Sequence, residues 1–187
     1  MSQQSTSHKQ GRYVEYGKQE GQLLYGEESC CATEPSFGEM YEDSPDAGGG
    51  TIIDCVIQND WYQWDGSLPG LSRGAPYVSH SAADHSLEIG EDGAGVYALN
   101  ANVSGHVEEL ATRNFQFYVF VNGSQSRLGC LLVFFNHGID EVAAICGNLE
   151  LSAGDKVSLW CRCTNAADTQ LAIHTVDVQI VRIGQEA

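Results

Sequence analysis

Short runs of alternating apolar and polar residues, separated by turn residues, constrain this chain more than any other feature. In residues 95–103 the apolar side chains Tyr97, Leu99, Ala101 and Val103 occupy alternate positions. Alternation of this kind places all four side chains on one face of a β-strand. No stretch after residue 50 keeps the 3.6-residue period of an amphipathic helix. The pattern therefore predicts an all-β fold.

Residues 115–121 repeat the alternation and are followed directly by Asn122 and Gly123, the strongest short signal for a β-hairpin. Further strands are expected at residues 51–57, 77–78, 87–89, 130–135, 142–151, 156–163 and 171–183. Residues 59–75, rich in Asp, Gly and Pro, are expected to form a loop. Many short strands with frequent turns predict a sandwich or a barrel.

The first 50 residues differ in composition from the rest. They hold three basic and nine acidic residues, contain few aliphatic side chains and end in three glycines. Such a segment buries too little apolar surface to offset its loss of chain entropy. We therefore expect an extended arm at residues 1–50 and one folded domain at residues 51–187. The aromatic residues that would anchor this arm on a partner are Tyr13, Tyr16, Tyr25, Phe37 and Tyr41.

The charge balance argues against two classes of partner. Twenty-five acidic residues against nine basic ones give a net charge of −16, so the chain lacks the basic surplus that binds nucleic acid or anionic membranes. No apolar run reaches the roughly 18–20 residues that span a bilayer. The polar first residues lack the apolar core of a secretory signal peptide. We expect a protein made in a cytoplasm.

The seven cysteines are Cys30, Cys31, Cys55, Cys130, Cys146, Cys161 and Cys163. An odd number without an export signal argues against a disulfide framework. Cys161 and Cys163 would share one face of a strand, and a zinc site would need a second such pair. Buried, reduced thiols are the preferred interpretation. The redox state of the adjacent Cys30 and Cys31 stays open.

No sequence motif of a hydrolase, a nucleotide-binding enzyme or a metalloprotease occurs. His80 and His85 flank Asp84 in a turn, where a small metal or acid–base site is conceivable but solvated histidines are the commoner case. His174 is expected to be a hydrogen-bonded strand histidine, and Asp140 to be solvated in a turn. We expect a protein that is not an enzyme and that uses no cofactor or metal.

Three aromatic residues gather in the long loop: Trp61, Tyr62 and Trp64. Amphipathic rings beside acidic residues suit stacking on a carbohydrate. The preferred interpretation is structural, because buried Trp contributes strongly to cores and interfaces.

Four segments and their order resemble the C1q/TNF-like jelly-roll family. Residues 95–99 (Gly-Val-Tyr-Ala-Leu) resemble its G-x-Y-x-hydrophobic strand, and residues 115–123 its central strand and hairpin. Residues 149–159 (Leu-Glu-Leu-Ser-Ala-Gly-Asp-Lys-Val-Ser-Leu) resemble its most specific segment, and residues 176–180 its closing strand. The likeness covers roughly residues 51–184. It implies a homotrimer in which one sheet packs around a threefold axis.

Several expected strands are apolar on both faces, and a second apolar face needs a partner. Strand alternation gives these candidates for the trimer interface: Val96, Ala98, Tyr118, Phe120, Leu132 and Phe134. The preferred function is a trimeric virion protein that decorates a viral (phage) capsid, bound to the major capsid protein through its arm. The alternatives are a receptor- or glycan-binding head of a phage fibre, with Trp61 to Trp64 as the binding loop, and a cellular C1q-like recognition module.

Overall fold

A computed structural model describes residues 36–43, 50–66, 72–75, 77–135 and 139–184, with the backbone alone at residues 72–75 and 130–135. Every regular element in these ranges is a β-strand, and no helix there is long and apolar enough to cross a membrane. The strands are β1 (Phe37–Asp43), β2 (Thr51–Cys55), β3 (Tyr62–Gln63), β4 (Ser72–Ala75), β5 (Val78–Ser81), β6 (Ser86–Ile89), β7 (Gly95–Val107), β8 (Arg113–Val121), β9 (Ser124–Phe135), β10 (Glu141–Leu151), β11 (Lys156–Cys163) and β12 (Thr169–Gly184).

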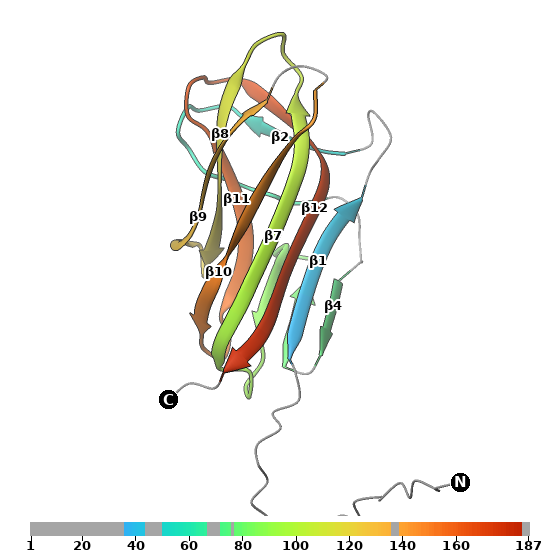
Figure 1. The fold of residues 1–187 in the computed structure, drawn as a ribbon, viewed down its shortest axis with the longest axis vertical. Helices are drawn as coiled ribbons and strands as arrows, with labels where there is room; N and C mark the ends of the chain where they lie inside the picture. The colour runs from blue at the N-terminus through green and yellow to red at the C-terminus, as the bar shows by residue number, and fades with distance from the viewer. Residues whose placement is uncertain (1–35, 44–49, 67–71, 76, 136–138, 185–187) are drawn as a thin grey trace, which may run out of the picture. The chain divides into compact units, whose positions relative to one another are not determined.

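The strands form two antiparallel sheets. The first sheet has the order β10-β7-β12-β1-β4, with β2 also paired to β12. The second sheet has the order β5-β6-β11-β8-β9, with β3 paired to β11. In Figure 1, β10, β7, β12, β1 and β4 lie side by side across the front, and β8 and β11 lie behind them. From β9 onward the chain crosses between the sheets at every connection, as it does in a jelly roll.

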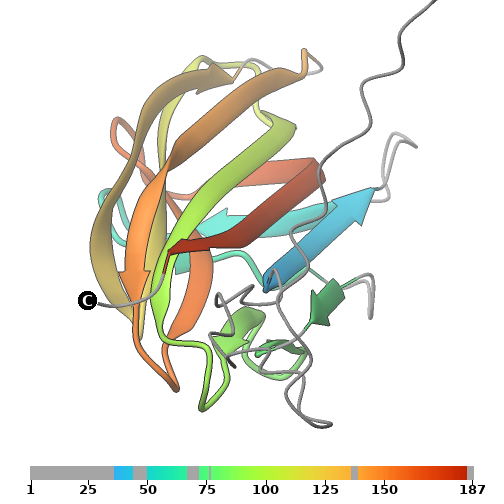
Figure 2. The same cartoon turned by 60° about the horizontal axis from the view of Figure 1, so that its bottom comes forward.

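The core lies between the two sheets and follows the alternation in the sequence. In β7, Tyr97, Leu99, Ala101 and Val103 are all buried, and β8 buries Phe115, Phe117 and Val119 in the same way. Side chains at the intervening positions of β7 point to the outer face, where they are half-buried or exposed. The predicted all-β jelly-roll fold is thereby confirmed. Figure 2 shows the two layers from one end.

The sandwich begins before residue 51, which corrects the expected boundary. Residues 37–43 are not part of an arm, because β1 pairs with β12 along its whole length and with β4 on its other side. The sequence Phe-Gly-Glu-Met-Tyr-Glu-Asp alternates weakly, with Met40 and Glu42 buried and Phe37 and Tyr41 on the outer face. Phe37 and Tyr41 are therefore sheet residues, whereas Tyr13, Tyr16 and Tyr25 lie outside the described residues.

The structure tests two further expectations, one about the long loop and one about the hairpin turn. Residues 59–75 are not one loop, because they contain the short strands β3 and β4. The hairpin at Asn122 and Gly123 is confirmed, with Val121 paired to Ser124 and both turn residues at positive φ (51° and 72°). Positive φ at both central positions is the requirement of a tight type I′ turn, which Asn-Gly satisfies with little strain.

The described thiols are free, and three of them lie in the core: Cys55, Cys161 and Cys163. The hydrogen bond with Cys55, together with burial, raises the pKa of the Cys161 thiol and keeps it protonated. Cys146 differs from the expectation because it is exposed on the outer face of β10. Cys30 and Cys31 lie outside the described residues.

Candidate interaction surfaces

The outer face of the first sheet carries several exposed apolar side chains. Exposed large apolar residues on strands of the first sheet are Phe37, Ile52, Val142, Val181 and Ile183, from 38% to 65% exposed. Within the described residues, no exposed large apolar side chain lies on a strand of the second sheet. Among the described side chains, exposed large apolar residues on strands are therefore confined to the first sheet; the side chains of residues 130–135 in β9 lie outside the described part.

The apolar residues of this face are aligned by strand register. Phe37 lies opposite Val181, and Val181 lies opposite Ala98, so one apolar row crosses β1, β12 and β7. Val96 and Ile183 extend it at the end of β7 and β12. Val142 begins a second apolar stretch on β10, which continues through Ala144 and Cys146. The half of the face formed by β7 and β10 therefore offers small and apolar side chains to a flat partner.

The half of the face formed by β1 and β12 is acidic. Glu39, Asp43 and Asp177 line a shallow groove together with Tyr41 and Thr175. Burial and the charge of Glu39 raise the pKa of Asp177, although a hydrogen bond from Gln179 acts in the opposite direction. Gln179 Nε2 donates to Glu39 Oε1 and to Asp177 Oδ2, each at 3.1 Å.

A cluster of His106, Asp140 and His174 lies at the far end of the same face. His106 is the penultimate residue of β7, Asp140 precedes β10, and His174 lies in β12 at a β-bulge between Ile173 and Thr175. Nδ1 of His106 is 3.0 Å from Asp140 Oδ1, and Nδ1 of His174 is 3.1 Å from Asp140 Oδ2. Burial alone would raise the pKa of Asp140, but these two hydrogen bonds and the nearby imidazoles outweigh it and lower the pKa.

Sequence reasoning did not join these three residues. The expected hydrogen bond of His174 is present, but its partner is Asp140, a residue that the sequence predicts to be solvated in a turn. The three residues are far apart in the sequence, and only the pairing of β7 with both β10 and β12 brings them together. A bulge in β12 has no reliable signal in one sequence, so the position of His174 could not be derived.

The outer face of the second sheet carries an aromatic cluster beneath Trp61. The Trp61 ring meets Tyr118 and Phe120 edge to face, with centroids 5.3 Å and 5.2 Å away. Phe120 stacks on Trp160 at 4.8 Å, and the Arg162 guanidinium lies 4.5 Å above the Trp61 ring. Edge-to-face and cation–π contacts of this kind hold the segment before β3 against the sheet.

The other two aromatic residues of this segment have structural contacts. Trp64 is 5% exposed, and its Nε1–H donates to Glu42 Oε2 at 2.9 Å. The Tyr62 hydroxyl accepts a hydrogen bond from the Ile57 backbone N–H at 2.7 Å. Trp64 is therefore a core residue, and Trp61 and Tyr62 are half-buried.

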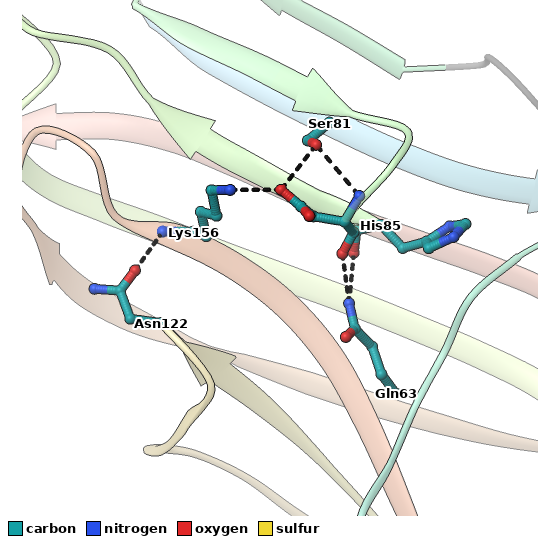
Figure 3. A network of polar contacts seen from close by, with 6 residues as sticks. Gln63, Ser81, His85, Asn122 and Lys156 are labelled. Atoms are coloured by element: carbon teal, nitrogen blue, oxygen red, sulfur yellow. Dashed lines mark hydrogen bonds and ion pairs between the residues drawn. The ribbon is translucent and has the colours of Figure 1, made fainter.

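The segment with His80, Asp84 and His85 does not converge on one site. Asp84 forms an ion pair with Lys156 and accepts a hydrogen bond from the Ser81 hydroxyl. These contacts with Lys156 and Ser81 lower the pKa of Asp84. Figure 3 shows the His85 ring directed away from this network, while the Asp84 and His85 carbonyls accept from Gln63. The Asp84 carboxylate fixes a turn onto β11.

The six candidates for the trimer interface divide between the sheets. Val96 and Ala98 lie on the outer face of the first sheet. Tyr118 and Phe120 lie on the outer face of the second sheet, beneath Trp61. Leu132 and Phe134 lie in β9, and their side chains are outside the described part. The outer faces of a sandwich point in opposite directions, so Val96 and Ala98 cannot line the same axis as Tyr118 and Phe120.

Strand order and register define this protein as an antiparallel jelly-roll sandwich. No family model and no curated protein matches the chain. Among solved structures it is similar to the Eiger TNF of S. frugiperda (13% identity, 82% of this chain and 96% of that chain, TM-score 0.47). It is also similar to murine APRIL (15%, 80% and 100%, TM-score 0.46) and Pika GITRL (14%, 82% and 98%, TM-score 0.44).

Proposed function

We propose that this protein is a non-enzymatic structural protein that associates into a homotrimer through the outer face of its first sheet. The proposal depends on one observation, the exposed apolar side chains on strands of the first sheet. Among the described side chains, which leave out residues 130–135 of β9, every exposed large apolar residue that lies on a strand belongs to the first sheet. Contiguous exposed apolar surface is typical of an interaction site. The resemblance to C1q/TNF-like proteins adds the threefold arrangement.

The β7–β10 half of the face is the part proposed to contact the other copies. Val142 of β10 is 65% exposed, and Val181 of β12, which borders this half opposite Ala98, is 41% exposed. Burial of either side chain in an interface would be favourable. Their neighbours Ala98 and Ala144 are small and allow a close approach between sheets. The acidic groove on β1 and β12 would stay at the periphery, where water screens Glu39 and Asp177.

Sedimentation equilibrium of the full chain tests the trimer. We expect the mass of three chains for the unmodified protein and a shift toward one chain for Val142→Asp and Val181→Asp, because each places a charge in an apolar contact. Leu110→Asp is the matched control, since Leu110 is 90% exposed in the connection between β7 and β8. A monomeric unmodified protein, or equal dissociation of the control, contradicts the proposal.

The finer role that we propose for the trimer is decoration of a viral capsid. The net charge of −16 on each chain supports this role, because such a charge keeps unattached trimers apart in solution. Three copies of the segment before residue 36 would bind one particle with avidity. The variant with Tyr13, Tyr16 and Tyr25 all changed to Ser should remain a trimer but no longer cosediment with purified particles. Unchanged cosedimentation of that variant argues against the role.

A recognition module is the second candidate, and the Trp61 cluster is the observation that favours it. Trp61, Trp160 and Arg162 are half-buried on the outer face of the second sheet. That face points away from the proposed trimer contact, so it would stay accessible. If a ligand binds there, Trp61→Ala abolishes binding to a glycan array or to cells while the trimer mass stays unchanged. A variant with unaltered binding excludes this surface.

A further inference from the structure

We propose that His106, Asp140 and His174 bind one late first-row divalent cation of the Zn²⁺ type. Each residue offers one ligand atom, and these atoms all lie within 4.8 Å of one another. The residues come from three neighbouring segments of the first sheet, namely the end of β7, the residue before β10 and the bulge of β12. The site is complete within one chain and does not depend on the proposed trimer.

The distances in the cluster are close to those of a metal centre. In a tetrahedral zinc site with bonds of about 2.0–2.1 Å, neighbouring ligand atoms are roughly 3.3 Å apart. The two Nδ1–Oδ distances are 3.0 Å and 3.1 Å, and the two rings meet at 80° with centroids 4.8 Å apart. All three ligand atoms lie within 4.8 Å of one another, so a cation between them would need the side chains to rotate closer together.

Proton positions in the cluster are compatible with metal binding. Without metal, an Nδ1–H on either imidazole can donate to an oxygen of Asp140. When the metal binds, each ring carries its proton on Nε2 and offers the Nδ1 lone pair to the cation. Glu108 Oε1 lies 3.6 Å from His106 Nε2, so a slightly closer approach would let it accept a hydrogen bond from that N–H. A carboxylate behind a histidine ligand is the usual arrangement that fixes the tautomer and the ring orientation.

The backbone is shaped to bring His174 to this point. The bulge makes His174 the extra residue between the partners of Gly105 and Ser104, so that His174 and Thr175 both lie on the outer face. Gly50 and Gly105 approach the strand closely here, since a Cβ on either would lie within 2.1 Å of a β12 carbonyl oxygen. Bulges that redirect one side chain are frequent next to functional sites.

The ligand set determines the class of metal. Two imidazoles and one carboxylate favour Zn²⁺, Co²⁺, Ni²⁺ or Cu²⁺ over Ca²⁺ and Mg²⁺, which prefer oxygen ligands alone. The histidine side chains are 15% and 11% exposed and that of Asp140 is 52% exposed. The site is therefore open on one side, and the fourth position of the metal would be taken by water or by an external group.

Calorimetric titration of the chelator-treated full chain with Zn²⁺, under reducing conditions, tests the site. We expect one equivalent to bind, and His106→Gln or His174→Gln to weaken binding at least about a hundredfold. Glu108→Gln should weaken it about tenfold, as loss of an outer partner does elsewhere. The matched control changes His80 and His85 to Gln and should bind as the unmodified chain does. No binding by the unmodified chain, or equal binding by the His106 and His174 variants, overturns the proposal.

Co²⁺ provides a second readout that needs no variant. Bound at this site, paramagnetic Co²⁺ should broaden the imidazole NMR signals of two of the six histidines. Its spectrum should lack the thiolate charge-transfer band of cysteine ligation. A strong thiolate band, or broadening of the His80 and His85 signals instead, shows that the metal binds elsewhere and contradicts the assignment.

Discussion

At the scale of single residues, Glu42 connects two parts of the chain that sequence reasoning had kept apart. Its carboxyl group accepts from the Thr51 N–H at 3.0 Å, from the Thr51 hydroxyl and from Trp64 Nε1 at 2.9 Å. Glu42 is 2% exposed, so water could not replace its carboxylate as the acceptor for these donors. Glu42, expected in the arm, and Trp64, a candidate of the ligand loop, together hold β1, β2 and the segment after β3 in place.

Glu42→Ala should lower the free energy of unfolding by about 3 kcal/mol, because several buried donors lose their acceptor. Urea denaturation measures the change. The adjacent Asp43→Ala, at an exposed position, is the control and should change the stability by less than about 0.5 kcal/mol. Equal losses in both variants would mean that the buried hydrogen bonds contribute little.

Asp177 gives a pH-dependent prediction. Since burial and Glu39 raise its pKa above the ordinary 3.8 in the folded protein, the folded state holds this proton more tightly than the unfolded chain. Its contribution to stability therefore falls as the pH rises from 3.8 through the folded-state pKa. Asp177→Asn removes this fall and should be more stable at neutral pH, by less than about 1 kcal/mol since the group keeps part of its solvent.

Thermal unfolding of Asp177→Asn and the unmodified chain across this pH range checks the sign. The two curves should converge below pH 3.8 and separate above it. Asp60→Asn, in an exposed loop, should follow the unmodified chain throughout. A variant that is less stable at neutral pH refutes the assigned cause.

At the scale of elements, two turns are joined by one side chain. Asn122, in the β8–β9 hairpin, donates from Nδ2 to Asp155 Oδ1 at 2.7 Å and accepts from the Lys156 N–H at 2.9 Å. Asp155 belongs to the turn before β11 and also accepts from the Ser152 N–H. The hairpin signal and the Gly-Asp segment of the sequence are therefore parts of one structural unit.

Asn122→Ala should reduce the stability by about 2 kcal/mol, because it removes both hydrogen bonds and strains a residue at φ 51°. Asn122→Gly is the matched variant, since it keeps the backbone conformation and loses only the amide. Its loss should be smaller by about 1 kcal/mol. Chemical denaturation separates the two effects, and identical losses would show that backbone strain is not involved.

At the scale of the whole molecule, the excess of acid governs assembly. Copies with a net charge of −16 repel one another, and added salt shortens the range of that repulsion from about 10 Å at 0.1 M to about 3 Å at 1 M. The proposed trimer should therefore bind more tightly as the NaCl concentration rises. Sedimentation equilibrium at several salt concentrations measures the dissociation constant. Dissociation on adding salt would point to an interface of ion pairs instead.

The fold could be derived from the sequence further than the sites could. The alternation from Tyr97 to Val103 and the Asn122-Gly123 turn depend on local backbone geometry. Local geometry of this kind can be predicted from a single sequence. β1 was missed because a buried Glu42 breaks the apolar alternation, and its partners Thr51 and Trp64 are distant in sequence. Whether an outward side chain faces a partner depends on which sheet its strand joins, and strand alternation does not show this. Ala98 and Tyr118 are therefore both predicted at the trimer interface, although they lie on opposite outer faces of the sandwich.

The position of β1 has a mechanical consequence. This strand is paired on both sides, to β12 and to β4, and Ser36 alone separates its first residue, Phe37, from the preceding segment. A pull applied through that segment would load the interior of a sheet in shear, against hydrogen bonds on two flanks and the buried Glu42. A tether joined to an edge strand would instead be peeled away one bond at a time.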